Sequence, residues 1–361
     1  MSLEHIVPHK WNTHGTRVEH PRSLAHGRQT CYHQIMPDLS TTYMGLRLKN
    51  PLIAGSSGLT GTPERLLALQ EGGVAAVVLK SIFEEEIAGE YAEVLAKATQ
   101  KGMSLESYDY YDYQIRGERV ASYVELVRQA KKDLSIPVIA SVNCTYSHEW
   151  ASFARDLEAA GADGLELNMF FLPSDLKRSS EEREKDYFLI VERVLKEVRV
   201  PVALKISPYF STLAQIINRL SRTGVAALVL FNRFYSIDFD IEKMAVTASH
   251  TLSTDAELAA PLRWVALMSR RVGCDLASST GTHDGVGLIK QLLAGAKAVQ
   301  AVSALYRNGP GYAARMLEEL GDWMNRHGYK VIADFRGKMS QAESEDPAAY
   351  ERVQFMKQFG G

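Results

Sequence analysis

The segment Gly161-Ala-Asp-Gly-Leu-Glu-Leu-Asn168 carries the pattern that decides the fold. A helix-like stretch ends at a glycine, and a small residue and a short apolar run follow. The same pattern recurs at 73–80, 224–232 and 295–303. Glycine is the usual residue where a helix ends in the left-handed conformation, and a short apolar run is typical of a strand buried on both faces. Each repeat therefore predicts a helix followed by a parallel strand.

Four further runs bring the predicted strands to eight. Proline opens the runs at 51–54, 137–143 and 201–205, and the last run is 275–278. Proline is tolerated at the first residue of a strand. Strands that alternate with helices in this number, over about 270 residues, predict a (β/α)8 TIM barrel. A doubly wound open sheet is the alternative, but no G-x-G-x-x-G follows the first strand.

The flanking segments differ from the repeats. Residues 1–38 are predicted to be a disordered or non-native extension, with Met36 as the native start, because six of the ten histidines fall there without periodicity. Their irregular spacing argues against a metal site. We expect the barrel at 39–338 and a helical C-terminal tail at 339–361. The segment 88–118 interrupts the alternation with five tyrosines, which favours a long connection that acts as a lid or an oligomer contact.

The composition excludes several classes of protein. Lys and Arg number 41 against 43 Asp and Glu, so the basic excess of a dedicated nucleic-acid binder is absent. The longest apolar runs reach about eight residues, far below the roughly 18 that a membrane span needs. Cys31, Cys144 and Cys274 form no C-x-x-C pair, which argues against a zinc ribbon. Scattered thiols favour a reducing, cytoplasmic setting. With nucleic-acid and membrane partners excluded, we expect a small-molecule substrate.

Polar residues stand where the predicted strands end. In TIM barrels the carboxyl ends of the strands meet at one mouth, where active sites lie. Asparagine and lysine there offer hydrogen bonds to a polar ring and positive charge for a developing anion. The turns after the last two strands suit a phosphate held by backbone N–H groups. We therefore predict a site for a flat, polar, phosphorylated ligand.

Several segments resemble the dihydroorotate dehydrogenases, including the class 1 enzymes and the flavin domain of dihydropyrimidine dehydrogenase. They are PLIAGSSG at 51–58, LKS at 79–81, IASVN at 139–143, GADGLELN at 161–168, ALKISP at 203–208 and VIADFRG at 331–337. The resemblance implies an FMN-binding barrel that moves a hydride between a CH–CH bond of a dihydropyrimidine-like substrate and flavin N5. It also implies a homodimer and leaves room for a separate electron-transfer partner.

The resemblance assigns roles to individual residues. Lys205 would contact the flavin N1/O2 edge and stabilise the reduced anion. Serine and asparagine side chains would surround the ring, and the turns after the last two strands would hold the phosphate. The implied cofactor-binding residues are Ser57, Gly58, Lys80, Ser81, Asn143, Asn168, Lys205, Asn232, Ser279, Gly281, Val302 and Ser303.

The sequence departs from the family at the catalytic base. Phe171 stands where the family has Cys or Ser, and phenylalanine accepts no proton. The pyrimidine-binding stretch Asn-x-Met-Gly-Leu-Pro-Asn of the class 1 enzymes is also absent. The predicted catalytic residues are therefore Lys205 with Ser174 and Tyr113 as substitute bases; Cys144 is a weaker candidate.

Two other functions stay open. One is a Schiff-base lyase, in which Lys205 or Lys80 would attack a carbonyl. The other is a flavin-binding family member that has lost dihydroorotate activity.

Overall fold

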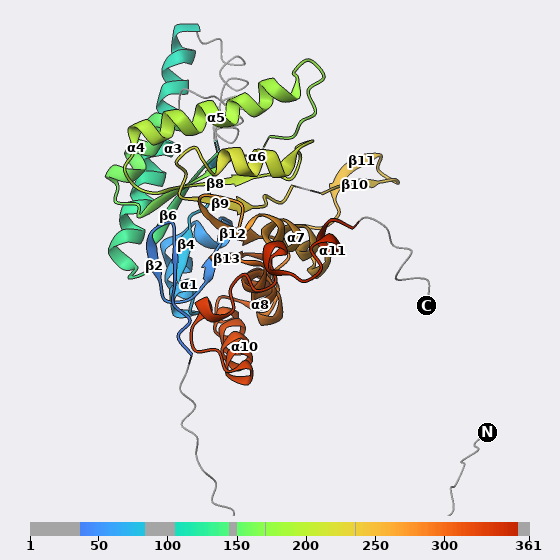
Figure 1. Cartoon of the computed structure of the whole chain (residues 1–361). Coiled ribbons are helices and arrows are strands. Elements are labelled where there is room, and N and C mark those ends of the chain that lie inside the picture. Colours follow the sequence, from blue (N-terminus) through green and yellow to red (C-terminus); the bar gives the residue numbers. More distant parts are fainter. Residues whose placement is uncertain (1–36, 84–104, 144–149, 170, 235, 353–361) are drawn as a thin grey trace, which may run out of the picture. The chain divides into compact units, whose positions relative to one another are not determined.

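The computed structural model describes residues 37–83, 105–143, 150–169, 171–234 and 236–352, without the side chains of 105–118 and 150. Eight parallel strands close into a barrel with helices around it (Figure 1). The barrel strands are β3 (Leu52–Ala54), β4 (Ala76–Val78), β6 (Val138–Asn143), β7 (Gly164–Asn168), β8 (Val202–Ile206), β9 (Ala227–Leu230), β12 (Asp275–Ser279) and β13 (Ala298–Ala301). Six of them lie within the runs predicted from the sequence, and β8 and β12 extend one residue beyond theirs, to Ile206 and Ser279. The TIM-barrel prediction is confirmed.

Hydrogen bonds between β4 and β6 and between β13 and β3 close the ring. A short strand, β5 (Ile82–Phe83), also pairs with β6, after the interruption at 79–81. The interruption turns Lys80 and Ser81 out of the sheet at the carboxyl end of β4.

The amino-terminal end of the barrel is plugged by a hairpin of β1 (Thr41–Tyr43) and β2 (Leu46–Leu48). Its turn residues Met44 and Gly45 both have positive φ, 54° and 76°, as a tight hairpin turn requires. Tyr43 and Met44 are buried among inward-facing residues, several of which are alanines from β8, β9, β12 and β13. These small side chains leave room for the plug, and polar groups inside the barrel lie toward the carboxyl end.

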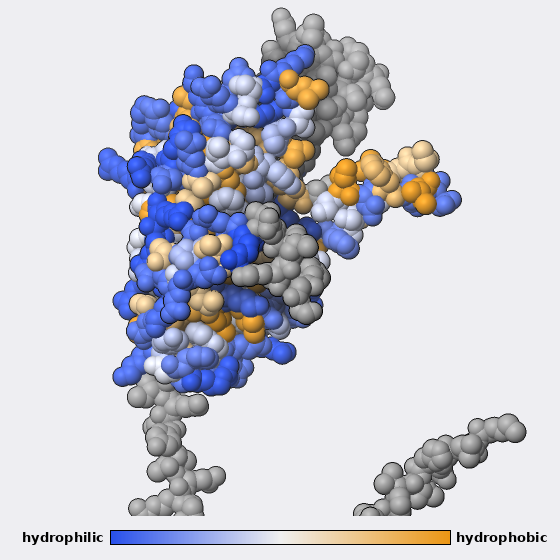
Figure 2. Space-filling model, turned by 45° about the vertical axis from the view of Figure 1, so that its right-hand side comes forward, coloured by the Kyte–Doolittle hydropathy of each residue, from blue (hydrophilic) through white to orange (hydrophobic). Residues whose placement is uncertain are grey.

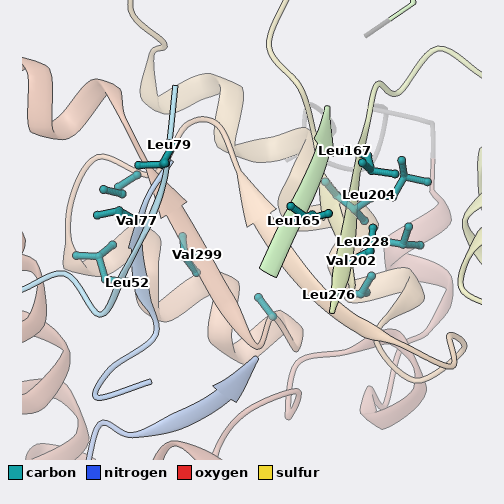
Figure 3. Close-up of a cluster of buried hydrophobic side chains, with 14 of the residues drawn as sticks. Leu52, Val77, Leu79, Leu165, Leu167, Val202, Leu204, Leu228, Leu276 and Val299 are labelled. Carbon is teal, nitrogen blue, oxygen red and sulfur yellow. The ribbon is translucent and has the colours of Figure 1, made fainter. Parts of the chain in front are cut away.

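The outward faces of the strands form the larger core, between the barrel and the helices (Figure 3). Leu165 and Leu167 of β7 point outward, whereas Glu166 between them is not part of either apolar cluster. Burial of each such leucine contributes about 1.5–3 kcal/mol. The covering helices are α1 (Pro63–Glu71), α3 (Leu105–Asp133), α4 (Trp150–Ala159), α5 (Ser180–Glu197), α6 (Leu213–Leu220), α7 (Ala259–Met268), α8 (Gly285–Ala294) and α10 (Tyr312–His327).

The tyrosine-rich segment differs from its prediction as a loop. Residues 105–118 form the first half of α3, a helix of 29 residues. The segment contains no proline and only one glycine, Gly117, so helix propagation meets little resistance. Tyr123 fixes α3 to the barrel, because its hydroxyl donates to the carbonyl of Ser141 and accepts from its N–H, both at 3.0 Å. Residues 84–104 lie outside the described part.

The described part of the C-terminal tail, 339–352, contains one short helix, α11 (Ala348–Glu351), and a 3-10 turn at Gln341–Glu343. The extension at 1–36 lies outside the described residues. In the part of the chain that the structure describes, no helix combines the length and apolar character that a membrane span requires.

A hairpin that the sequence did not predict follows β9 and projects from the barrel (Figures 1 and 2). It pairs β10 (Ile237–Asp240) with β11 (Ala245–Ala248), and Phe239 lies opposite Val246. Both of these side chains are exposed, as are Ile237 and Met244. The hairpin therefore presents an apolar face to solvent.

Candidate active site

A cavity of about 880 Å³ opens at the carboxyl end of the barrel. This volume lies in the range of roughly 300–1,000 Å³ typical of small-molecule sites. The cavity is lined by residues at the ends of β3, β4, β7, β8, β9, β12 and β13. The residues predicted to bind the cofactor that line it are Ser57, Gly58, Lys80, Ser81, Asn168, Lys205, Asn232, Ser279, Gly281, Val302 and Ser303. Asn143, half-buried at the end of β6, is not among its lining residues.

One wall of the cavity is a cluster of serines tied together by hydrogen bonds. The hydroxyl of Ser81 lies 3.1 Å from that of Ser56 and 2.6 Å from that of Ser141. Asn168 donates its side-chain N–H to the Ser81 hydroxyl at 3.4 Å. The carboxamide oxygen of Asn168 is buried and has no hydrogen-bond partner in the protein. A buried acceptor of this kind is costly unless a ligand or water supplies a donor.

The cavity floor carries a buried positive charge. Lys205 Nζ donates to Gln300 Oε1 at 2.8 Å and lies 3.6 Å from Glu166 Oε1. Gln300 in turn donates to Glu166 Oε2 at 2.5 Å. All three residues are buried. Burial of an isolated charge is unfavourable, so the carboxylate and the amide stabilise the ammonium in this place.

Arg233 binds the segment between β11 and α7, which borders the cavity. Its guanidinium donates to the carbonyls of His250 at 3.0 Å and Thr251 at 3.1 Å. It also donates to Glu257 Oε2 at 2.8 Å. Burial opposes ionisation of Glu257, but the hydrogen bond from Arg233 and the bonds from Thr254 outweigh it, and the pKa of Glu257 is lowered.

The turns after β12 and β13 form the end of the cavity that was predicted to hold a phosphate. Thr280 and Gly281 both have positive φ, 82° and 79°. A Cβ atom on Gly281 would lie 2.2 Å from the backbone nitrogen of Leu258, so only glycine fits there. The Ser303 hydroxyl accepts from the N–H of Ser253 at 2.9 Å.

Two side chains behind this turn hold Ser253. Arg307 donates to the Ser253 carbonyl at 2.9 Å, and His283 Nε2 lies 3.0 Å from the Ser253 hydroxyl. Burial lowers the pKa of His283, against the opposing effect of Asp255. The end of the cavity proposed to bind the phosphate is therefore shaped by the close packing of Gly281 on Leu258 and by the hydrogen bonds that hold Ser253.

These features fit FMN. The unpartnered oxygen of Asn168 lies in a wall of hydroxyl and amide groups that suits a polar ring. Thr280 and Gly281 both line the cavity, and because Gly281 has no side chain its backbone is open to a ligand, as in phosphate-binding turns. Among the described residues, no group of three or more His, Cys, Asp or Glu side chains is placed to hold a metal.

The loop after β7 contains Phe171 and Ser174, and neither residue lines the cavity. Phe171 packs edge-to-face on Tyr187, with the ring centroids 5.5 Å apart. Tyr187 packs in the same way on Phe210, at 5.2 Å. Ser174 is exposed and lies on the same loop. Phe171 therefore lies in an aromatic cluster beside α5, outside the lining of the large cavity.

The other proposed bases are Tyr113, Tyr110 and Cys144, and the side chains of all three lie outside the residues that the structure describes. The backbone of Tyr113 is in α3, but its side chain is outside the described residues, as is that of Tyr110. Cys144 is also outside them.

Sequence reasoning missed several residues of the site. Glu166 and Gln300 had a usable signal, because each is a polar residue at an inward position within an otherwise apolar strand. Arg233, His283 and Arg307 had none, because their roles depend on loop backbone that the sequence pattern does not place.

Comparison with known proteins agrees with this arrangement. A family profile for dihydroorotate dehydrogenase matches residues 38–324. The catalytic subunit of dihydroorotate dehydrogenase B (NAD(+)) from Thermoplasma acidophilum is 29% identical over 308 residues, 84% of this chain and 99% of that protein. Dihydroorotate dehydrogenase A (fumarate) from Lactococcus lactis subsp. lactis is 24% identical over 326 residues, 83% of this chain and 99% of that protein. The chain belongs to the dihydroorotate dehydrogenase family, and it is an oxidoreductase that acts on CH–CH donors.

Proposed function

We propose that the chain is a cytoplasmic FMN-dependent oxidoreductase that transfers a hydride between a CH–CH bond of a dihydropyrimidine-like substrate and flavin N5. The observation that carries this proposal is the convergence of the predicted cofactor residues on one cavity. When bound there, FMN supplies the hydride acceptor. A Schiff-base lyase is less well supported, because the Lys205 nitrogen is already held by Gln300 and faces Glu166.

The residues of the cavity divide by task. Gly281 and Ser303 would bind the phosphate, and Val302 lies beside them in the lining. Asn168, with its unpartnered oxygen, and Ser81, which it contacts, would orient the ring. Lys205 would place positive charge beside the edge of the ring where negative charge develops, which is an interaction stronger in the transition state than in the ground state.

We infer that dihydroorotate itself is a poor substrate. Phe171 replaces the family's base and packs on Tyr187, so the loop after β7 offers no proton acceptor at that position. Ser174 and Tyr113 remain the proposed substitute bases, and Ser174→Ala and Tyr113→Phe are the variants that test them. A flavin-binding protein that has lost turnover of dihydroorotate is the second candidate, favoured by the same placement of Phe171.

We also propose that the chain self-associates through the hairpin of β10 and β11. Ile237 and Phe239 of β10 lie opposite Ala248 and Val246 of β11, so their side chains share one exposed face. An isolated two-stranded ribbon is marginally stable in water, so a second copy that covers the apolar face would stabilise it. Phe239→Asp should then convert a dimer to a monomer in sedimentation. A separate electron-transfer partner also remains proposed, since the Thermoplasma acidophilum relative is named a catalytic subunit.

The test is anaerobic reduction of the FMN-loaded protein by a panel of dihydropyrimidines, followed by flavin absorbance. We expect bleaching with at least one member of the panel, and slower bleaching with dihydroorotate than with that member. General-base catalysis is worth about 10²–10⁴-fold, which sets the expected deficit for dihydroorotate. Bound FMN that no dihydropyrimidine reduces would favour the second candidate. A colourless protein that substrate and borohydride inactivate together would favour the lyase.

A further inference from the structure

We propose that Glu166 and Gln300 are positioning residues that hold the ammonium group of Lys205 at one place in the cavity floor. The inference rests on the proposed flavin function, and it assigns a task to two buried residues that the family motifs do not explain. Gln300 is among the residues that line the cavity and Glu166 is not, and we assign both of them a role that acts through Lys205.

The three residues form a polar bridge inside the barrel. Glu166 is on β7 and Gln300 is on β13, and the strand order places these two strands opposite each other in the ring. The hydrogen bond of 2.5 Å between their side chains therefore crosses the interior of the barrel. Lys205, on β8 next to β7, joins the bridge through its bond of 2.8 Å to Gln300.

The chemistry of the three groups fixes the direction of every bond. A carboxylate only accepts hydrogen bonds and an ammonium only donates them. Glu166 therefore requires the NH2 group of Gln300, which turns the carboxamide oxygen of Gln300 toward Lys205. The negative charge of Glu166 thus sets the orientation of Gln300, and Gln300 sets the position of the ammonium.

The neighbouring backbone leaves space for the bridge. A Cβ atom on Gly55, which follows β3, would lie 3.3 Å from Gln300 Cβ and 2.9 Å from Val302 Cγ2. Glycine at this position allows the long Gln300 side chain to extend across the barrel. The bridge is well shielded from water, since Glu166 and Gln300 are each 1% exposed and Lys205 is 7% exposed.

Loss of the Glu166 charge should release the bridge without emptying the cavity. In Glu166→Gln, residue 166 can donate as well as accept, so Gln300 is no longer held in one orientation and can present its NH2 group to Lys205. The ammonium would lose its acceptor and move. Hydrogen bonds to charged groups contribute about 1.5–3 kcal/mol, so the expected loss is about 10–100-fold in any equilibrium that depends on Lys205.

The experiment measures sulfite binding to the FMN-loaded protein by flavin absorbance. Sulfite adds to flavin N5 and leaves negative charge on the N1/O2 edge, so its dissociation constant reports the charge beside that edge without turnover. Lys205→Met, which removes the ammonium group, gives the largest weakening of sulfite binding that loss of this charge can cause. We expect Glu166→Gln to weaken sulfite binding by about 10-fold or more, with FMN content retained. Gln300→Met should do the same, which keeps the test valid if one variant folds poorly.

An exchange of the two side chains supplies the rescue. In the double variant Glu166→Gln, Gln300→Glu, the amide at 166 donates to the carboxylate at 300, which accepts directly from Lys205. We expect sulfite binding to return to within about threefold of the parent, and the thermal stability of the flavin-free protein to recover with it. Gln291→Leu, a buried amide in α8 away from the cavity, is the control and should change neither the dissociation constant nor the FMN content.

The outcomes separate the inference from the proposed function. Weak sulfite binding in Lys205→Met together with unchanged binding in Glu166→Gln and Gln300→Met would overturn the positioning role alone. Unchanged binding in all three variants would remove Lys205 from the flavin edge and overturn the proposed function's assignment as well.

Discussion

The turns after β12 and β13 and the loop after β7 lie at the same end of the barrel. They differ in whether their side chains line the cavity there. Gly281 and Ser303, from the first pair, line the large cavity. Phe171, from the second, packs on Tyr187 beside α5. The turns after β12 and β13 carry the features expected for FMN, whereas the loop after β7 carries a phenylalanine at 171, which accepts no proton. Two loops at the same end of one barrel can therefore differ in whether their side chains line the cavity.

The largest effect should come from a negative charge at the phosphate end. Ser303→Asp would set a carboxylate beside the phosphate, and like charges about 4 Å apart repel by about 4 kcal/mol at the effective dielectric of a protein surface. We expect FMN affinity to fall by at least about 100-fold, measured by quenching of flavin fluorescence on titration.

Ser303→Ala is the matched control, because it removes the hydroxyl without adding charge. It should weaken FMN binding by about 10-fold or less. Equal affinities of the aspartate variant and the parent protein would place the phosphate elsewhere.

The next largest effect should come from removal of the Lys205 charge in the floor of the cavity. Lys205→Ala should slow flavin reduction by roughly 100-fold, the usual result of removing one preorganised group that stabilises developing charge. FMN content should fall much less, because the phosphate end is intact. Stopped-flow absorbance with any accepted substrate measures the rate. Reduction at the parent rate would exclude Lys205 from this role.

The fold was largely predictable because most barrel strands are marked locally. Glycine or proline at the start of a run and a polar residue at its end are visible in one segment such as 161–168. That most of the proposed cofactor residues line one cavity was predictable for the same reason, since strand ends converge wherever a barrel closes.

What escaped prediction depends on contacts between distant segments. Gln300 bonds to Glu166, 134 positions away, and the sequence contains no sign of that pairing. Arg233 binds carbonyls of a loop whose course the sequence does not fix. The packing of Phe171 on Tyr187 could not be predicted from the sequence, because it depends on the position of α5.

The loop after β7 should matter for stability more than for the cofactor. Phe171→Ala removes a half-buried ring from its contact with Tyr187, and we expect a loss of about 2 kcal/mol in the free energy of unfolding in urea. FMN affinity should change by less than about twofold. Leu172→Ala, next in the chain and exposed, is the control and should have no measurable effect.

A second substitution at this position, Phe171→Cys, tests whether the loop after β7 reaches the substrate. We expect it to leave dihydroorotate oxidation at background, because the position faces the aromatic cluster and the pyrimidine-binding stretch is absent. A rise of about 100-fold or more would show that the loop still reaches the substrate.

The smallest effect is a pH dependence at the phosphate end. Burial lowers the pKa of His283 below its ordinary value of 6.5, so the folded state prefers the neutral ring. The stabilisation is complete above pH 6.5 and is lost as the pH falls through the lower pKa of the folded state. Between pH 8 and pH 5.5, His283→Gln should lose about 2 °C less in melting temperature than the parent protein. An identical loss in both proteins would contradict this assignment.

Binding of FMN at the mouth of the barrel is tested most directly by titration of the protein with the cofactor. The protein should be purified, stripped of bound small molecules, and titrated with FMN while absorbance and fluorescence are recorded. We expect saturation at one FMN per chain and much weaker binding of riboflavin, which lacks the phosphate. Absence of saturable FMN binding in folded protein, or equal affinity for riboflavin, would contradict this expectation.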